Sequence, residues 1–381
     1  MGPRRALVLS HPDLVRELFV REAKHFVRGV TGGPLRSTLG EGLLLSEGDV
    51  WRRQRRDVQP LFGAEWVAGS VASIRAAAEA LISRWSDGER RDMHREMHRL
   101  TLDVAARLFL GVESDDRGRL HPALETILDQ RIFRATLPVP RFRWPLRSSG
   151  ATRELDELVF GQIARRSSRA GTFLAALAAT ARDRRELRDQ LVTLIFTAQD
   201  TTAVALTWLW HFVSQNARVE TALREELNGS ADAVGARCGP YVAAVLNETL
   251  RLFPPVIGQA REAVDECEIA GLPIGRGDLV MFSQWVIHRD HRWFDRPDEF
   301  LPERWADGLE DRLHPFAYFP FGGGRRVCVG RSLALAIGAT VVPLIARRYR
   351  LHAIPGHRPG IHAIISPRPR RGLPMEVRRS A

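Results

Sequence analysis

The chain has 381 residues and a formal net charge of +11, carried by 56 basic and 45 acidic residues. Lys24 is the only lysine, and the arginines are scattered and not gathered in one block with interleaved aromatics, which argues against a nucleic-acid-binding protein. Three cysteines without framework spacing and the lack of a signal-peptide pattern exclude a disulfide-built secreted fold, so we expect a cytoplasmic protein without a membrane anchor.

Hydrophobic periodicity over the first 150 residues predicts a short strand followed by amphipathic helices. The strand is expected over Ala6–Leu9, and a helix begins after His11-Pro12-Asp13. Further helices are expected over 71–85, 93–110 and 121–133. Prolines break the segment 136–150 into a surface loop. Its aromatics Phe142 and Trp144 favour apolar capture over the alternative of a plain linker.

Another helix is expected after Asp49 and carries Trp-Arg-Arg-Gln-Arg-Arg over residues 51–56. Trp51 and Arg55 lie four residues apart and therefore share one face of this helix. Taken alone, such a charged face is most simply explained as solvated.

The segment 184–216 predicts one helix of roughly 50 Å at a rise of 1.5 Å per residue. Its middle is apolar on nearly every side, which is typical of a helix in the core of a large domain. The central residues Gln199, Asp200, Thr201 and Thr202 argue against a membrane span. A carboxylate at such a position is costly unless it has a purpose or a partner, so Asp200 is a candidate functional residue.

Several weaker signals follow the central helix. The helix expected over 241–253 contains Glu248-x-x-Arg251, a spacing that in most proteins decorates a surface. Short strands come next, with turns at Ala270-Gly271 and 275–277.

The segment Phe321–Gly330 reads FGGGRRVCVG, and an apolar helix-forming run over 332–345 follows it. Glycines allow the backbone to approach a bulky planar group closely. The positive end of the following helix points back at the loop, which favours a thiolate over a thiol at Cys328. The loop therefore suits a sulfur ligand.

This loop also has simpler explanations. A lone cysteine is usually a small buried hydrophobe. A dinucleotide-binding glycine motif fails, because its third glycine would fall on Val327. A zinc site would need clustered partners, and Cys238 and Cys267 are distant in the sequence.

The pattern Phe321-x-x-Gly324-x-Arg326-x-Cys328-x-Gly330 closely resembles the haem-binding loop of cytochrome P-450 monooxygenases. The segments 197–202 (TAQDTT), 248–251 (ETLR) and 302–305 (PERW) resemble other motifs of the same family, in the family's order. The chain departs from the family pattern at Thr197, at Ala198, where glycine is usual, and at Ile337, where glutamate is usual. The resemblance covers nearly the whole chain, and residues 368–377 resemble the family's terminal strand region.

This resemblance implies a mainly α fold with small β-sheets (α+β), the cytochrome P-450 fold. A long central helix would lie over the haem, and the cysteine-ligand loop would precede a C-terminal helix. One catalytic domain is expected over residues 1–381, with a short N-terminus.

The resemblance also implies haem b (iron protoporphyrin IX) as the cofactor and Cys328 as the ligand of its iron. Asp200 and Thr201 would be the catalytic pair that relays protons to dioxygen. The other residues that it assigns to cofactor binding are Arg326, Arg261, Arg55, Trp51, Phe321, Gly324, Gly330 and Ala198. A structural lock of Glu248, Arg251 and Arg304 is expected just behind the cysteine loop.

The implied reaction inserts one oxygen atom of dioxygen into a small apolar substrate, such as a terpenoid, polyketide, fatty acid or aromatic compound of secondary metabolism. Its cavity is expected to include the segment before Trp51, the loop near Trp144, Phe196–Thr201 and Val256-Ile257-Gly258. Two alternatives remain open: a haem-thiolate enzyme of another type (peroxide-driven, isomerase or dehydratase) and a catalytically silent haem-binding recruitment module.

Electrons must come from outside, because the sequence carries no flavin or iron–sulfur motif. We expect NAD(P)H as their source, and a reductase with an acidic ferredoxin or flavodoxin as their carrier. The residues expected to form a basic docking face for this carrier are Arg52, Arg53, Arg56, Arg325 and Arg331.

Overall fold

The computed structural model describes residues 5–29, 33–112, 120, 122–123, 126, 150–166, 168–229, 239–363 and 366–380. The loop that contains Phe142 and Trp144, most of the helix expected over 121–133, and Cys238 lie outside the described residues. The expected terminal strand region is found as two strands, β10 and β11.

Helices make up most of the described chain. They are α1 (Pro12–Arg16), α2 (Gly33–Leu39), α3 (Gly48–Val58), α4 (Ala64–Ile82), α5 (Met93–Ala105), α7 (Gly150–Arg166), α8 (Phe173–Ala178), α9 (Arg184–Gln215), α10 (Ala217–Gly229), α11 (Pro240–Leu252), α12 (Gln284–Ile287), α13 (Leu309–Arg312) and α14 (Arg331–Arg348). Shorter turns of π or 3-10 helix are η1 (Glu17–Arg21), η2 (Ala23–His25), η4 (Gln59–Phe62), η5 (Ala106–Leu110), η6 (Pro302–Gly308) and η7 (Gly324–Arg326).

The strands form small sheets at the edges of the helical body. They are β1 (Ala6–Leu9), β2 (Phe26–Val27), β3 (Glu89–Asp92), β4 (Gln259–Ala263), β5 (Cys267–Ile269), β6 (Leu272–Ile274), β7 (Leu279–Phe282), β8 (Tyr349–Ala353), β9 (Ile361–Ala363), β10 (Pro367–Pro369) and β11 (Pro374–Arg379). The largest sheet has the order β1-β7-β4-β2, with β1 parallel to β7 and Ala6 opposite Leu279. A second sheet has the order β3-β11-β8, and β5-β6 and β10-β9 are hairpins. The expected mainly α fold with small sheets is confirmed.

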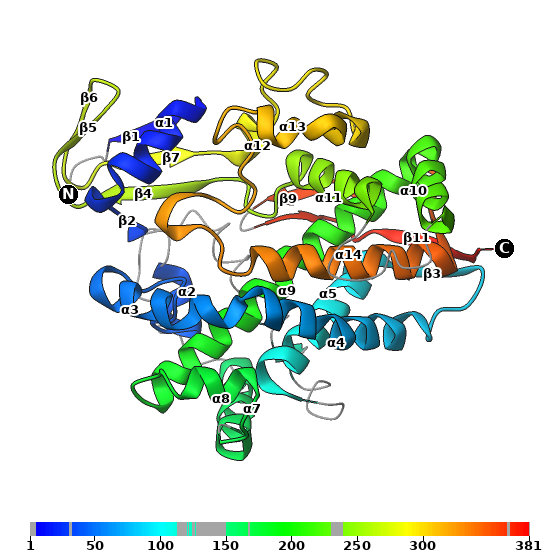
Figure 1. Cartoon of the computed structure of the whole chain (residues 1–381), viewed down its shortest axis with the longest axis horizontal. Coiled ribbons are helices and arrows are strands. Elements are labelled where there is room, and N and C mark those ends of the chain that lie inside the picture. Colours follow the sequence, from blue (N-terminus) through cyan, green and yellow to red (C-terminus); the bar gives the residue numbers. More distant parts are fainter. Residues whose placement is uncertain are drawn as a thin grey trace.

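The central helix α9 is 32 residues long and runs through the middle of the molecule, where α5 packs along it (Figure 1). It begins at its cap Asp183, whose side chain accepts a hydrogen bond from the Glu186 N–H at 2.8 Å. Helix α14 packs along α4 in front of α9 in this view. None of the described helices is long and apolar enough to cross a membrane.

Glu248, Arg251 and Arg304 form a buried polar network, which we call the polar lock. Arg251 donates two hydrogen bonds of 2.8 Å to the Glu248 carboxylate, and Arg304 Nε donates a third at 2.9 Å. Trp305 Nε1 and the Leu301 N–H each donate to the same carboxylate at 2.9 Å. The remaining Arg251 donors reach backbone carbonyls between α12 and η6, so the lock joins α11 to that irregular segment.

Replacing Glu248 by alanine tests the lock. The change leaves two buried guanidinium groups without their carboxylate, and we expect it to lower the free energy of unfolding by about 3–5 kcal/mol. Urea denaturation measures the effect. The matched control is Glu299→Ala, because the Glu299 side chain is 56% exposed and its ion pair with Arg296 should contribute about 0–1 kcal/mol. Equal losses in both variants would contradict the assignment.

Candidate functional site

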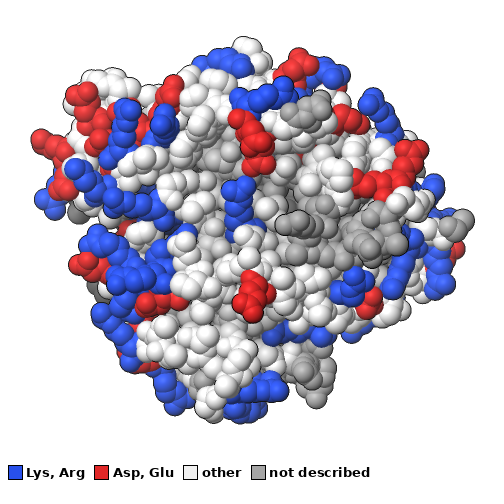
Figure 2. Space-filling model, in the orientation of Figure 1, with Lys and Arg blue, Asp and Glu red and all other residues white. Residues whose placement is uncertain are grey.

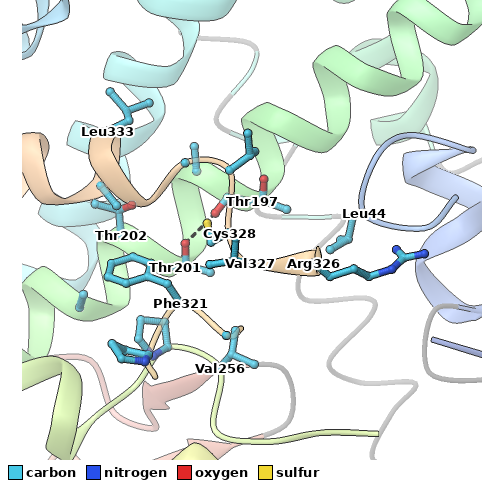
Figure 3. Close-up of a pocket in the computed structure, with 18 of the residues that line it drawn as sticks. Leu44, Thr197, Thr201, Thr202, Val256, Phe321, Arg326, Val327, Cys328 and Leu333 are labelled. Atoms are coloured by element: carbon cyan, nitrogen blue, oxygen red, sulfur yellow. Dashed lines mark hydrogen bonds between the residues drawn. The ribbon is translucent and has the colours of Figure 1, made fainter. Parts of the chain in front are cut away.

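An interior cavity of about 330 Å³ lies between α9, the cysteine loop and the start of α14. Figure 3 looks into it, with Cys328, Phe321 and Val327 of the loop drawn near Thr197 and Thr201 of α9. Most of the other lining side chains are apolar. They come from several segments and include Leu43, Leu44, Phe62, Phe109, Leu194, Val256, Leu333 and Ile337.

One stripe of α9 faces the cavity. The residues that form it are Thr193, Leu194, Thr197, Ala198, Thr201, Thr202, Ala205 and Leu206, in pairs four residues apart, as the helical repeat requires. Thr201 Oγ1 donates to the Thr197 carbonyl at 2.7 Å. Ala198 and Thr201 therefore lie where the sequence placed them. Phe196, Ile257 and Gly258 were expected to line the cavity and do not, whereas Val256 does.

Cys328 presents its thiol to this cavity. The side chain is exposed, but the surface that it exposes lies inside the protein, so burial raises the pKa of the Cys328 thiol. A hydrogen bond from the Gly330 N–H and the charges of Arg55 and Arg28 lower this pKa by a smaller amount. The Gly330 N–H at the start of α14 thus favours the thiolate, as the sequence predicts, but burial has the larger effect on the pKa. Binding to a metal ion would provide the missing stabilisation of the thiolate.

Gly324 allows the cysteine loop to pack against the first helical segment. Its φ is +61°, and a Cβ atom there would lie 2.3 Å from the carbonyl oxygen of Phe19. Only glycine fits both constraints without movement of the backbone. The loop is thereby held against η1, with Phe321, Cys328 and Gly330 all on the cavity wall.

Four arginines line the cavity: Arg28, Arg55, Arg261 and Arg326. Burial, together with the charges of Arg28 and Arg326, lowers the pKa of Arg261 to about 9. Burial and the Arg326 charge lower the pKa of Arg28 to about 10. Guanidinium groups that repel one another at the wall of a largely apolar cavity favour an anionic group beside them.

Each of the sequence-predicted residues on this wall has contacts within the chain. Arg326 pairs with Glu47 and lies over the Trp51 ring, 4.4 Å from its centroid. Arg55 Nη1 donates to the Val327 carbonyl at 2.8 Å, which ties α3 to the cysteine loop. Trp51 and Arg55 thus face the cavity from α3 and are not a solvated face.

Asp200 lies outside the cavity wall. Its carboxylate is buried and accepts hydrogen bonds from Ser366 Oγ at 3.0 Å and from Arg368, with which it forms an ion pair. Asp200 and Thr201 are neighbours in sequence, but they are turned about 100° apart around the helix. Their assignment as a proton-relaying pair stays a prediction.

His288 connects the polar lock to the cysteine loop. The ring is fully buried, with Nδ1 3.3 Å from the Arg251 carbonyl oxygen, and its Nε2 accepts a hydrogen bond from the Phe319 N–H at 3.0 Å. This arrangement requires a neutral ring, and burial lowers the pKa of His288 to about 3. The lock therefore sits just behind the segment that leads into the loop.

Sequence reasoning missed Arg28, Glu47, Phe62 and Phe109 as residues that line or support the cavity. Phe62 and Phe109 form an aromatic cluster with Trp66, and their ring centroids lie 6.0 Å apart. Glu47 directly precedes the arginine-rich helix α3, and a lone carboxylate beside a basic helix is a usable signal in the sequence. Nothing in the local sequence around Arg28 points to its place.

The cavity residues fit a flat, largely apolar group that bears carboxylates and an iron atom. The apolar walls suit its faces, the arginines suit its carboxylates, and the Cys328 sulfur is a suitable iron ligand. Among the described residues, no group of three or more His, Cys, Asp or Glu residues could hold a metal ion by itself. Haem is a cofactor with these properties.

Comparison with known proteins also points to a haem protein. The family model described as Cytochrome P450 matches residues 1–150 and 163–363. Cyclooctatin synthase of Streptomyces melanosporofaciens is 30% identical, over 98% of this chain and 85% of its own. Cyclooctat-9-en-7-ol 5-monooxygenase of the same organism is 29% identical, over 93% of this chain and 82% of its own. The retinoic acid-bound cyanobacterial CYP120A1 has a TM-score of 0.87 and 27% identity, covering 99% of this chain and 90% of its own.

The buried neutral ring of His288 should make the protein sensitive to acid. Its folded pKa lies below the ordinary value of about 6.5, so the unfolded chain binds a proton first, and stability falls as the pH drops from about 6.5 toward 3. In His288→Gln, we expect the loss of unfolding free energy between pH 6.5 and 4.5 to shrink by about 2 kcal/mol. Urea titrations at both pH values measure it.

The control for this experiment is His291→Gln, because the His291 side chain is 87% exposed. We expect its pH dependence to match that of the unaltered protein. A His288→Gln variant with the same acid sensitivity as the unaltered protein would refute the role given to His288.

Proposed function

This chain belongs to the cytochrome P450 family of haem-dependent monooxygenases, and we propose that it inserts one oxygen atom of dioxygen into a small apolar terpenoid of secondary metabolism. The observation that carries the proposal is the cavity in which Cys328, four arginines and one face of α9 meet. Bound haem supplies an iron centre that activates dioxygen, with a thiolate ligand that favours cleavage of the O–O bond.

Several residues of this chain would hold the cofactor. Cys328 would bind the iron as a thiolate, and Arg28, Arg55 and Arg261 would neutralise the propionates. Arg326 serves the same group, with Glu47 limiting its net charge. Gly324 keeps the loop close to η1, so that the sulfur is aimed into the cavity. On α9, the Thr201 hydroxyl can give up its bond to the Thr197 carbonyl and donate to an oxygen atom at the reacting position.

The side chains that line the cavity and the names of similar proteins both support an apolar substrate. Leu44, Phe109, Leu194 and Val256 offer apolar contacts, while the polar side chains of the α9 stripe are those of Thr193, Thr197, Thr201 and Thr202. A cavity of this kind holds an apolar molecule and orients it by a few polar contacts. The names of the relatives refer to cyclooctatin, cyclooctat-9-en-7-ol and retinoic acid, which support an apolar terpenoid as substrate.

Electrons reach the cofactor from an acidic ferredoxin or flavodoxin in this proposal. Figure 2 shows Lys and Arg side chains gathered at the left of the molecule, over α3 and its surroundings. Arg56 and Arg325 are exposed. Arg53 turns inward and pairs with Glu186, and Arg52 and Arg331 pair with surface carboxylates. The docking face is therefore narrower than the set of five arginines that the sequence suggested.

A Cys328→Ser variant tests the cofactor ligand. We expect the purified protein to give the red-shifted band of a thiolate-ligated ferrous carbonyl and the variant to lose it, because a hydroxyl does not replace a thiolate on iron. Cys267→Ser is the matched control, since Cys267 lies in β5, away from the cavity. The substrate class is tested on the unaltered protein by spectral titration with cyclooctat-9-en-7-ol and retinoic acid; no shift with either would count against a terpenoid.

Salt dependence tests the electron donor. Reduction by an acidic [2Fe–2S] ferredoxin should slow as salt rises, because ions screen attraction between exposed charges. The double variant Arg56→Gln/Arg325→Gln should lower the rate about threefold at low salt. Stopped-flow reduction measures this. The control Arg218→Gln removes an 83% exposed arginine of α10. A reduction rate that changes neither with salt nor in the double variant would contradict docking at this face.

A further inference from the structure

A buried cluster of polar residues lies on the side of α9 that faces away from the cavity. Asp200 lies at its centre. The Asp200 carboxylate forms an ion pair with Arg368 of β10 and accepts a hydrogen bond of 3.0 Å from Ser366 Oγ. From α5, His98 brings its Nε2 to 3.9 Å from Asp200 Oδ1. The proposed reaction uses none of these partners, although burying them together requires that they satisfy one another.

The His98 ring is oriented so that its proton faces Asp200. The residue is 4% exposed, and its Nδ1 lies 2.7 Å from the amide nitrogen of Gln199. With that amide donating to Nδ1, the ring carries its proton on Nε2, the atom nearest to Asp200. A motion of about 1 Å would bring this atom within hydrogen-bond distance.

His94 extends the cluster toward the surface. Its ring is half-buried and packs edge-on against His98, with centroids 4.4 Å apart. Its Nδ1 lies 3.4 Å from Thr207 Oγ1 on α9. The two imidazoles lie one turn apart on α5, so together they span the distance from the half-buried end of the cluster to the buried carboxylate.

The charges around His94 come from three elements besides α5. Arg368 of β10 and Arg95 of α5 disfavour the protonated ring, whereas Asp92 of β3 and Asp200 of α9 favour it. Burial outweighs these charges and lowers the pKa of His94 to about 4. The ring is therefore neutral near pH 7, a state that can both accept and release a proton.

We propose that His98 supplies protons to Asp200 and that His94 is the entrance through which they arrive from solvent. The proposal rests on the proposed function, because hydroxylation consumes one dioxygen, two electrons and two protons, and gives one hydroxylated product and one water. In each transfer His98 first takes up a proton on Nδ1 from the His94 side, as the Gln199 amide turns away, and becomes an imidazolium. Its Nε2–H bond then breaks and an O–H bond forms on Asp200, which leaves a neutral ring. Asp200 releases this proton to the reaction and returns to a carboxylate. Arg368 is a positioning residue that holds the carboxylate beside His98.

The first test needs no catalysis. Histidines labelled with ¹⁵N are titrated by NMR between pH 4 and 9 in the unaltered protein and in Asp200→Asn, with His94 and His98 assigned from the spectra of their glutamine variants. Removing the carboxylate should lower the imidazole pKa of His98 by about one unit or more, since a negative charge at that distance stabilises the protonated ring. His211, farther along α9, should not change. If the His98 imidazole titrates in the same way in Asp200→Asn and in the unaltered protein, the proposal is overturned.

The second test measures turnover. With an acidic [2Fe–2S] ferredoxin, its NADPH-dependent reductase and retinoic acid as the probe, His98→Gln should lower kcat by about tenfold or more at an unchanged KM, because glutamine keeps a polar amide but cannot carry a proton. The solvent deuterium isotope effect on kcat should rise in this variant. The control is His211→Gln, the same change on the helix that carries Asp200. Equal kcat and isotope effects in His98→Gln and the unaltered enzyme would overturn the proposal.

The carbonyl spectrum separates the two possible failures. If the unaltered protein lacks the thiolate band, the monooxygenase function fails, and the proton supply fails with it. If the band and turnover are intact and His98→Gln behaves as the unaltered enzyme does, only the proton supply from His98 is refuted.

Discussion

Glu248 is a fully buried carboxylate, and the geometry of the cysteine loop depends on the five hydrogen bonds that it accepts. A buried charge is tolerated only when its partners are complete, so the arrangement around it has little freedom. Arg251 carries the constraint to backbone carbonyls, and His288 carries it on to Phe319. Cys328 is thereby placed by a polar framework behind it, and Gly324 allows the close contact in front.

The charges at the cavity wall are arranged differently from those of the polar lock. The charge of Arg326 lowers the pKa of Arg28, and the charges of Arg28 and Arg326 lower the pKa of Arg261, while the Glu47 carboxylate raises the pKa of all three. The lock is satisfied within the chain, whereas this wall favours an additional anion. Haem propionates would meet that need.

The two faces of α9 divide the proposed chemistry. Thr197 and Thr201 lie on the cavity stripe, while Asp200 points to a polar cluster between α5 and β10. Oxygen chemistry and proton supply would then be separated by the width of one helix. A helix that is apolar on nearly all sides can carry such a polar cluster only because its partners arrive from other elements.

Local sequence signals determined a large part of this protein. The glycine pattern and Cys328 identify the ligand loop, the cap at Asp183 and the apolar period define α9, and the spacing of Glu248 and Arg251 puts both on one helix face. These features are encoded within a few residues of one another. The directions of buried side chains were decided by tertiary structure: Asp200 turns to Arg368, Arg53 turns to Glu186, and Arg28 reaches the cavity wall. Each of these depends on a partner far away in the chain, and a rotation of 100° per residue lets neighbouring positions face different surroundings.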